Sequence, residues 1–573
     1  MLLHPKKQNR EYSDEKTEEI MEKTIEFFEN KGLKKIKEDD HERVWYSDFL
    51  DFIKKEKIFA TLLTPSGYGA EDSRWDTWRI NQFNEILAFY GLGYWYTWQV
   101  SILGLGPIWM SKNEAIKNKT AQLLQDGGIF AFGLSEKEHG ADIYSSEMAL
   151  IPREDGTYVA RGSKYYIGNG NKAALVSTFG VFSDGGDPND EKYGKYVFFT
   201  VDSQRKKEYE LLKNIIATQC YVAEYALHDY PITETDILAK GRDAWDATLN
   251  TVNVGKVNLG WASIGICTHA FYEAINHAAH RRLFDHYITD FTHIQSFFVD
   301  AYCRLLGMKL FALRGADYMR AASPQDRRYL LYNPMVKMKV TTEGENVINL
   351  LWDIIAAKGF EYDTYFEMAA RDIRALPKLE GTVHVNMALI IKFMPNYFFK
   401  PKEYPEVPKR NDVSDDTFLF NQGQTKGLTE IQFHDYNIAY NSVDLPNVNI
   451  FKEQINVFKE FMMKATPTMK QAKDIDFVLL GGELFTLVVY GQLLLENARI
   501  YGIEDDVVDQ MFDFIIRDFS KYALMMYSKP ISTDKQVEYL HKMIKRPNRD
   551  DKRFKRVWEN HVYALKDTYV MNE

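Results

Sequence analysis

The chain has 573 residues, of which 45% are hydrophobic and 27% charged, and its formal net charge at pH 7 is −10. This length exceeds what one hydrophobic core supports, so we expect two to four packed units of an ordinary soluble globular protein. The acidic balance, with no dominant basic block, argues against a nucleic-acid partner, while local positive groups can still bind an anionic substrate.

The predicted elements begin with helices up to about residue 126. From Ser13 to Leu33 the apolar residues recur at helix spacing, a Ser-Asp pair precedes them, and Gly32 is the predicted helix end. From Gly128 short β-rich runs follow, divided by turn residues such as Asp155 and Gly156. Helical spacing then returns and continues to about residue 399. This order is not the alternating βαβ order of a doubly wound nucleotide-binding sheet.

A stretch rich in Pro and charged residues, 401–430, separates the second helical block from further amphipathic helices. Such composition is typical of a linker or a long surface excursion. The predicted domains are an N-terminal helical domain (1–127), a middle β domain (128–243), a helical domain (244–400), the linker (401–430) and a C-terminal helical extension (431–573).

The cysteines and the apolar runs bear on the compartment. Cys220, Cys267 and Cys303 are far apart, show no C-x-x-C spacing and are odd in number. A disulfide framework or a thiolate metal site is therefore not expected, no metal site is predicted, and a reducing compartment fits best. The N-terminal sequence has no apolar core of a secretory signal, and a Gly-Gly pair and a Glu interrupt the apolar run from Phe477. We expect a cytoplasmic protein without a transmembrane segment, in which this run is a buried helix.

Three motifs carry candidate chemistry. LSEKEHGAD begins at Leu134 and leads into the β block, GSKYYIGNGNK begins at Gly162 within it, and RDIRALPKLEGTVHVN begins at Arg371 late in the second helical block. Each alone also suits a plain structural role: a turn, core strand residues, or a helix end followed by a cap. Their combination and order are more specific than any one of them.

Together the motifs resemble those of the acyl-CoA dehydrogenase family over about residues 40–400. LSEKEHGAD resembles T-E-x-x-x-G-S-D, GSKYYIGNG resembles G-x-K-x-W-I-T-N-G, and the stretch from Arg371 to Thr382 resembles R-D-x-x-x-x-x-x-x-E-G-T. Arg281, three residues before Phe284, is a fourth match. The resemblance implies a mostly α fold with a central β-barrel-like domain. It also implies FAD-dependent α,β-dehydrogenation of acyl-CoA thioesters to trans-2-enoyl-CoA.

The resemblance implies a role for each matching residue. Glu380 would remove the α-proton while flavin N5 takes the β-hydride, and a carboxylate suits this because desolvation raises its pKa. Arg281 and Phe284 would reach the FAD of a neighbouring subunit, although Arg281 can also be a solvated helix charge and His384 a structural imidazole. The residues implied to bind FAD are Leu134, Ser135, Tyr166, Gly168, Arg281, Phe284, Thr382 and His384. Those implied to bind substrate are Ala141, Asn253, Lys256 and Gly381.

Several positions depart from the family pattern. Gly168 stands where most members have a Thr that bonds flavin N5, Ala356–Ala357 replaces a Gly-Gly pair, and Lys256 replaces an Arg. A Gly at this position also occurs in acyl-CoA oxidases, so an oxidase that passes electrons to O₂ is an alternative. A non-catalytic FAD- or acyl-CoA-binding relative is an alternative of another class. Asp142 and the short β block favour the dehydrogenase, and Glu380 favours an enzyme.

The C-terminal extension resembles that of very-long-chain acyl-CoA dehydrogenases, where it covers surface that smaller members use to form tetramers. We therefore expect a homodimer, with an acyl-CoA substrate and an electron-transfer flavoprotein as acceptor. Fatty-acid β-oxidation is the expected setting, and the acyl chain length is open. Trp95, Trp98, Gln99 and Trp109 lie where the family lines the far end of the acyl pocket, and they can equally pack the helical core.

Overall fold

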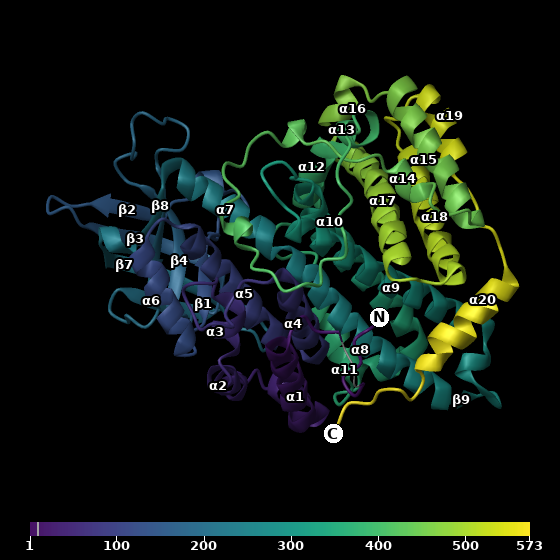
Figure 1. Cartoon of the computed structure of the whole chain (residues 1–573), viewed down its shortest axis with the longest axis horizontal. Helices are drawn as coiled ribbons and strands as arrows, with labels where there is room; N and C mark the ends of the chain where they lie inside the picture. Colours follow the sequence, from purple (N-terminus) through teal and green to yellow (C-terminus); the bar gives the residue numbers. More distant parts are fainter. Residues whose placement is uncertain (8–10) are drawn as a thin grey trace. The chain divides into compact units, whose positions relative to one another are not determined.

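The computed structural model describes residues 1–7 and 11–573, which group into two compact units (Figure 1). The N-terminal unit comprises Asn9–Asn258, Asn411–Lys426 and Met571–Glu573. The helical unit comprises Met1–Gln8, Leu259–Arg410 and Gly427–Val570. The helices that follow residue 427 thus pack into the same unit as those that carry the third motif.

The N-terminal unit combines helices with a sheet. Its helices are α1 (Glu15–His41), α2 (Ser47–Lys55), α3 (Ile58–Leu63), α4 (Thr77–Tyr90), α5 (Leu92–Met110), α6 (Glu114–Gln125) and α7 (Gly241–Gly255). Helix α5 is buried along almost its whole length because it packs against the first strand of the sheet. At the closest approach Gly104 faces the backbone of Ala131, where a Cβ would come within 2.6 Å of the carbonyl oxygen.

Helix α1 does not end at Gly32, which corrects the expectation from the sequence. Gly32 takes a φ of 75°, and the helix kinks there and continues to His41. The reason is a contact far away in sequence. The Leu33 N–H donates to the Asn572 carbonyl at 2.8 Å, and a Cβ on residue 32 would collide with the Glu573 carbonyl. A glycine is needed here for both the backbone angle and the close approach.

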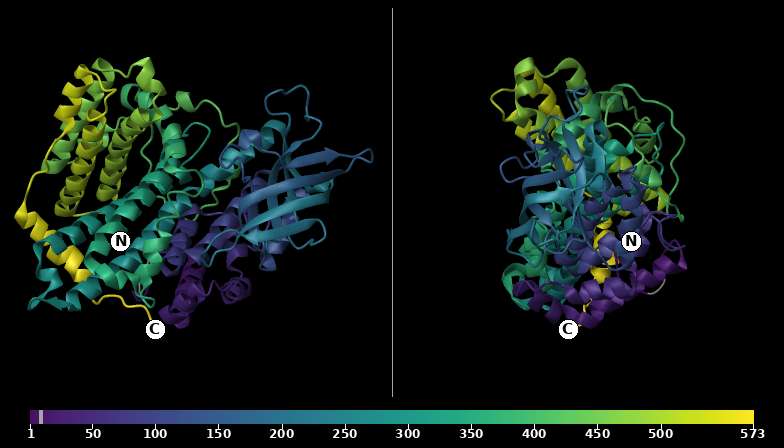
Figure 2. Two further views of the ribbon diagram at one scale, coloured as in Figure 1. Left: turned by 180° about the vertical axis from the view of Figure 1, so that it is seen from behind. Right: turned by 90° about the vertical axis from the view of Figure 1, so that its left-hand side faces the viewer.

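The sheet of the N-terminal unit has eight strands and is largely antiparallel (Figure 2). The strands are β1 (Phe130–Gly133), β2 (Ala149–Pro152), β3 (Tyr158–Gly168), β4 (Leu175–Phe182), β5 (Tyr196–Val201), β6 (Tyr209–Asn214), β7 (Val222–Ile232) and β8 (Ile237–Lys240). Their order is β6-β7-β3-β2-β4-β5-β8, and β1 and β2 each pair with β4 in parallel. The expected fold class is confirmed, and among the described residues the sheet runs from edge to edge without closing into a barrel.

The helical unit is a bundle with one small hairpin. Its helices are α8 (Val257–His280), α9 (Thr292–Arg320), α10 (Tyr329–Ile355), α11 (Tyr365–Asp372), α12 (Val383–Ile390), α13 (Met394–Phe399), α14 (Asn437–Tyr440), α15 (Pro446–Lys464), α16 (Met469–Lys473), α17 (Ile475–Ile500), α18 (Asp505–Tyr527), α19 (Asp534–Met543) and α20 (Asp551–Val557). The hairpin strands are β9 (Arg282–Leu283) and β10 (His286–Tyr287). In the described part of the chain, α17 is long and apolar enough to cross a membrane, and 78% of its most apolar window is buried inside the protein.

Buried ionic clusters tie the C-terminal extension to the earlier helices of this unit. Arg304 of α9 donates to Glu343 of α10 at 2.7 Å and to Asp518 of α18 at 2.8 Å. A second cluster joins Glu496 of α17 to Arg314 of α9 at 2.7 Å, and to His434 at 2.9 Å. Charges buried at such positions require their partners, so the extension is fixed to this unit by specific pairs as well as by apolar packing.

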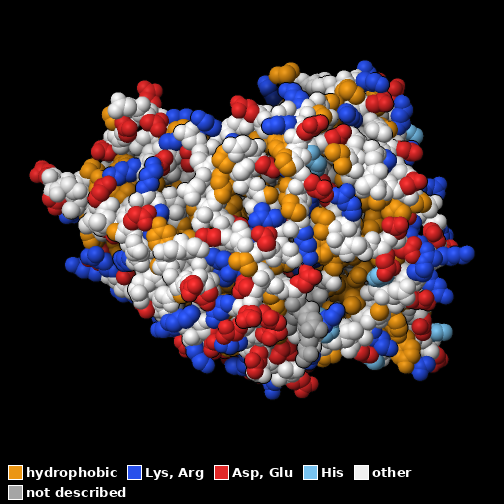
Figure 3. Space-filling model, viewed as in Figure 1, with side chains coloured by type: hydrophobic (Ala, Val, Ile, Leu, Met, Phe, Trp, Pro, Cys, Tyr) orange, Lys and Arg blue, Asp and Glu red, His pale blue; other side chains and the backbone are white. Residues whose placement is uncertain are grey.

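The surface carries both signs of charge. On the face drawn in Figure 3, Lys and Arg side chains are interspersed with Asp and Glu and do not gather into one block. This agrees with the composition, in which 81 acidic residues outnumber 71 basic ones.

Candidate functional site

The first two motifs lie side by side in the N-terminal unit. The Ser135 hydroxyl donates to the Tyr165 carbonyl at 2.6 Å, and the Tyr165 N–H donates to the Ser135 carbonyl at 3.0 Å. The Lys164 ammonium donates to the Leu134 carbonyl at 2.9 Å. Residues 134–135, which follow strand β1, are therefore held against the end of strand β3, although the two segments are thirty residues apart.

A buried ion pair beneath these segments was not among the predicted site residues. The Lys164 ammonium donates to a Glu136 oxygen at 2.7 Å, and Glu136 also accepts the backbone N–H groups of Glu147 and Met148. Burial lowers the pKa of Lys164 to about 8. Burial alone would raise the pKa of Glu136, and the Lys164 ammonium holds it below its ordinary value. Glu136 lies in the first motif and Lys164 in the second. Two opposite charges inside the motifs are the sequence signal that could have predicted this ion pair.

Tyr166 is turned outward by an irregularity in strand β3. The pairing of β3 with β7 shifts by one residue between Lys164 and Ile167, as in a β-bulge, and Tyr166 takes a φ of 66°. Its side chain is 63% exposed. A large aromatic side chain this exposed at a strained backbone position has its ring available to another molecule.

Gly168 follows on the same strand and is fully enclosed. A Cβ at this position would lie 2.7 Å from a Tyr96 ring carbon, 2.7 Å from Val100 and 2.9 Å from the Tyr96 hydroxyl. Helix α5 therefore fills the space that a side chain at residue 168 would take. The glycine therefore leaves no opening at residue 168.

Three of the predicted substrate-binding residues lie elsewhere in the N-terminal unit. Ala141 is exposed in the turn before Asp142, which caps the short 3-10 turn Ile143–Ser145. Asn253 and Lys256 are buried at and after the end of helix α7. The structure thus groups Leu134 and Ser135 with the end of β3 and places these three residues on other segments.

The tryptophans of α5 are core residues. The indole N–H groups of Trp95 and Trp98 both donate to the Asn84 side-chain oxygen at 2.9 Å, and that of Trp109 donates to the Leu63 carbonyl. Gln99 donates to the Gly255 carbonyl at 3.0 Å. These satisfied and buried groups have the packing expected of core side chains.

Glu380 and Gly381 lie in the helical unit, in the loop between α11 and α12. Glu380 takes a φ of 51° and Gly381 a φ of 85°, so the chain passes through two consecutive left-handed residues. The Glu380 side chain is half-buried. Thr382 follows as the N-cap of α12, where its hydroxyl accepts the Val385 N–H at 3.4 Å. The plain structural role considered for this motif, a helix cap, is therefore present at Thr382. An unusual left-handed loop precedes this cap.

Exposed donor groups lie at the start of α12 and just before the hairpin. Thr382 and His384 are exposed at the N-terminus of this helix, and Arg281 is exposed where α8 meets β9. Phe284 is 87% exposed at the hairpin tip with a φ of 52°. At the end of α10, Ala356 keeps a φ of 53° where the family pattern has a glycine.

These groups fit FAD. A guanidinium, a hydroxyl, an imidazole and a helix N-terminus are the donors that phosphates and ribityl hydroxyls require. An exposed aromatic ring such as that of Tyr166 suits contact with a flavin ring. In the helical unit the observation that supports the fit is the exposure of Arg281, Thr382 and His384. In the N-terminal unit it is the exposure of Tyr166.

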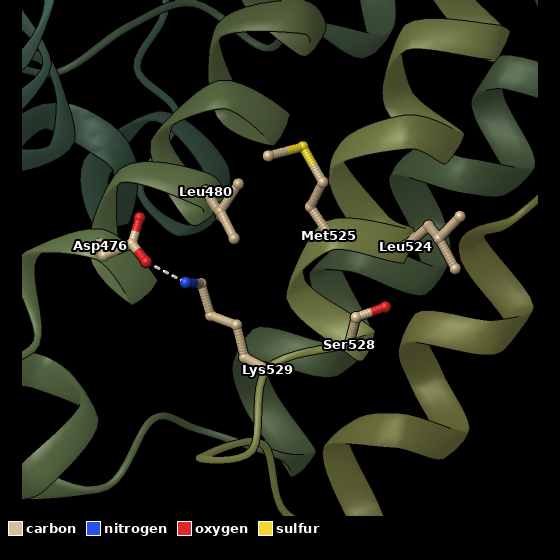
Figure 4. A pocket seen from close by; sticks show the side chains of 6 residues that line it. All are labelled: Asp476, Leu480, Leu524, Met525, Ser528 and Lys529. Carbon is tan, nitrogen blue, oxygen red and sulfur yellow. Dashed lines mark hydrogen bonds and ion pairs between the residues drawn. The ribbon is translucent and has the colours of Figure 1, made fainter.

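A surface pocket elsewhere in the helical unit has none of these residues. About 420 Å³ in volume, it lies between the start of α17 and the end of α18 (Figure 4). Leu480, Leu524 and Met525 line it, and Asp476 pairs with Lys529 at its side. Its polar lining groups are Ser528 and the Asp476–Lys529 pair, and none of the predicted site residues is among them, so it is a poor candidate for the predicted chemistry.

Part of the chain matches a known family of proteins. The sequence model of the acyl-CoA dehydrogenase C-terminal domain matches residues 243–394, which include the Glu380 loop. A short-chain-specific acyl-CoA dehydrogenase from Megasphaera elsdenii is 24% identical over 379 residues, which cover 63% of this chain and 93% of that protein. The chain is thus similar to acyl-CoA dehydrogenases, and residues 243–394 match their C-terminal domain. These findings support an oxidoreductase of the acyl-CoA dehydrogenase type.

Solved structures extend the likeness to the whole chain. An acyl-CoA dehydrogenase from Bacillus anthracis, complexed with FAD, superposes with a TM-score of 0.74 at 15% identity and covers 97% of this chain and 96% of that one. The prolyl acyl carrier protein oxidase AnaB has a TM-score of 0.57 at 20% identity and covers 66% of this chain and 99% of that one. At these identities the likeness is one of fold, and a dehydrogenase and an oxidase both share this fold with the chain.

Proposed function

We propose that this chain oxidises acyl-CoA thioesters to trans-2-enoyl-CoA with FAD as its cofactor and Glu380 as the base. The observation that carries the proposal is the Glu380 loop, in which a half-buried carboxylate follows the family motif on a left-handed backbone. FAD, when bound, supplies the hydride-accepting chemistry. The protein supplies the base, the orientation of the substrate and the exclusion of water.

The base has a demanding task. A proton α to a thioester is only weakly acidic, so the carboxylate must be held close to it and be partly desolvated. Glu380 would take this proton on a carboxylate oxygen. The following glycine has no side chain, which permits close approach of the backbone to the thioester. The Glu380 N–H can then donate to the thioester oxygen and stabilise the charge that develops there.

Each unit, described by itself, offers groups suited to a part of FAD. In the helical unit, Arg281, Thr382 and His384 offer exposed donors for the phosphates and hydroxyls. In the N-terminal unit, the backbone of Leu134 and Ser135 and the ring of Tyr166 would contact the flavin. The pairing of Ser135 with Tyr165 supports this, because it fixes both segments relative to one another.

A dehydrogenase is favoured over an oxidase by the surroundings of Gly168. An oxidase explanation requires free space near residue 168 that admits O₂, but Tyr96 and Val100 fill that space. The proposed acceptor of the electrons is therefore an electron-transfer flavoprotein.

The proposal is tested by anaerobic titration of the purified protein with saturated acyl-CoAs of several lengths, followed through the visible flavin absorption. Bleaching by at least one acyl-CoA is expected, and Glu380→Gln should abolish it. Glu361→Gln is the matched control, because Glu361 is a surface carboxylate of the same unit that pairs with Lys358. A flavin that no acyl-CoA bleaches, or a Glu380→Gln variant that bleaches normally, would overturn the proposal. Readmitted air should restore the colour slowly, whereas fast recovery with peroxide would mark an oxidase.

We further propose that the protein acts as a cytoplasmic homodimer in fatty-acid β-oxidation. The exposed hairpin with Phe284 at its tip supports an assembly, because such an apolar side chain is stable when a neighbouring molecule covers it. Sedimentation velocity should give the mass of a dimer, and a stable tetramer would contradict this.

A further inference from the structure

A buried lysine holds the loop that carries Glu380. Lys337 lies on α10 and is fully buried. Its ammonium donates to the Pro377 carbonyl at 2.8 Å and to the Gly381 carbonyl at 2.5 Å. These two carbonyls lie on either side of Glu380, so one side chain spans the loop from before the base to after it.

The loop needs such support. A left-handed φ at Glu380 costs free energy because a residue with a Cβ meets its own carbonyl there. The Asn386 side chain adds a donor to the Gly381 carbonyl and another to the Thr382 carbonyl, both at 3.0 Å. Burying an ammonium group costs free energy unless it is hydrogen-bonded. The hydrogen bonds from Lys337 to these backbone carbonyls therefore compensate for its burial. The contacts therefore fix the backbone on which the Glu380 side chain is mounted.

We infer that Lys337 is a positioning residue for proton abstraction, which holds Glu380 at the angle and depth that the reaction requires. This inference rests on the proposed function. Lys337 does not touch the reacting atoms in this assignment and acts only through the backbone of residues 377–381. A displacement of a reacting group by about 1 Å costs on the order of 100-fold in rate.

The test compares Lys337→Met with Lys339→Met in the FAD-loaded protein. Methionine keeps the length of the side chain and removes the donors. Lys339 is the matched control, because it is a buried lysine two residues along the same helix that pairs with Glu343 and not with the loop. The reaction is followed in two ways, as flavin reduction by acyl-CoA and as uptake of deuterium from D₂O at the α-carbon, each per mole of bound flavin.

Lys337→Met is expected to lower both rates about 100-fold while the substrate concentration at half-saturation changes less than about threefold. Amide hydrogen exchange of residues 379–383 should become faster in this variant and not in Lys339→Met. That readout reports the order of the loop without any turnover. Lys337→Arg, which restores donors, should recover part of the lost rate.

The outcomes separate the inference from the function on which it rests. If the wild-type protein catalyses no uptake of deuterium at the α-carbon of the acyl-CoA, the proposed function fails and the inference falls with it. If the wild type exchanges, Glu380→Gln does not, and Lys337→Met matches the wild type, only the inference is overturned. Should Lys337→Met fail to fold, Asn386→Ala decides the matter, since loss of its donation to Gly381 should lower both rates in the same direction. Unchanged rates in that variant would overturn the inference.

Discussion

Replacing Glu136 by Gln is expected to destabilise the N-terminal unit, because Lys164 would lose the charge that accompanies its burial. The Lys164 side chain is fully buried, and its ammonium donates to Glu136 at 2.7 Å. A glutamine keeps the shape of the side chain but not its negative charge. The N–H groups of Glu147 and Met148 donate to different oxygens of the carboxylate, at 2.8 and 3.1 Å, so the amide nitrogen of a glutamine would face one of these two donors.

The magnitude follows from the burial of the ammonium. The pKa of Lys164 falls from 10.5 to about 8 in the folded protein, so the charged form already costs the folded state about 3 kcal/mol at pH 7. Removing one partner of a buried pair costs about 3–5 kcal/mol more. The pH dependence has a definite sign. Because the unfolded chain keeps this proton up to pH 10.5, the contribution of Lys164 to stability rises with pH from about 8, and in Glu136→Gln that rise should begin at lower pH.

Thermal unfolding of the FAD-loaded protein measures the effect. A loss of this size in a unit of about 250 residues corresponds to a fall in Tm on the order of 10 °C. Glu147→Gln is the control. This substitution removes the same charge eleven residues along the chain, from a side chain that is 80% exposed. A Tm for Glu136→Gln no lower than that for Glu147→Gln would refute the reasoning.

Three further changes should have measurable effects. Gly32→Ala should cost about 1–3 kcal/mol, because it places a Cβ at a φ of 75° against residues 572 and 573, and a lower Tm would show it. Gly168→Ala should lower the free energy of unfolding by about 1–3 kcal/mol, because the added Cβ overpacks the site. Val100→Ala in the same chain should restore part of this loss, whereas losses that add up in the double variant would contradict the contact. Burial alone would raise the pKa of Glu496, but His434 and a neighbouring Arg hold it well below its ordinary value. Its contribution to stability is therefore present above about pH 4.5 and lost as the pH falls, so Glu496→Gln should flatten the decline of Tm between pH 5 and 3.

The sequence motifs were sufficient for the fold class and for the family, because each motif keeps its residues at fixed spacing within one element. They could not reveal how the elements support one another. The pattern around Gly32 resembles an ordinary helix end, since the contact that makes the helix continue comes from residues 540 positions later. Lys337 lies in an amphipathic helix without any local signal, and its role depends on a loop forty residues away.

The interpretation of Gly168 shows the same limit. A glycine in place of a larger residue predicts space, and this is correct only when the surroundings stay unchanged. Here Tyr96 and Val100 of another helix occupy that volume. Neither residue belongs to a motif, so nothing in the sequence linked them to Gly168.

The kink of α1 also has a consequence for biosynthesis. Residues 571–573 belong to the N-terminal unit, and they pack against Gly32 and Leu33 near its start. A ribosome adds about 5–20 residues per second. The first helix therefore waits on the order of 30–100 s after it emerges before the peptide that completes its packing has been made. During this interval the Leu33 N–H lacks the Asn572 carbonyl to which it donates in the folded protein. The nascent chain, rather than the finished protein, is therefore the form in which this segment is available to chaperones.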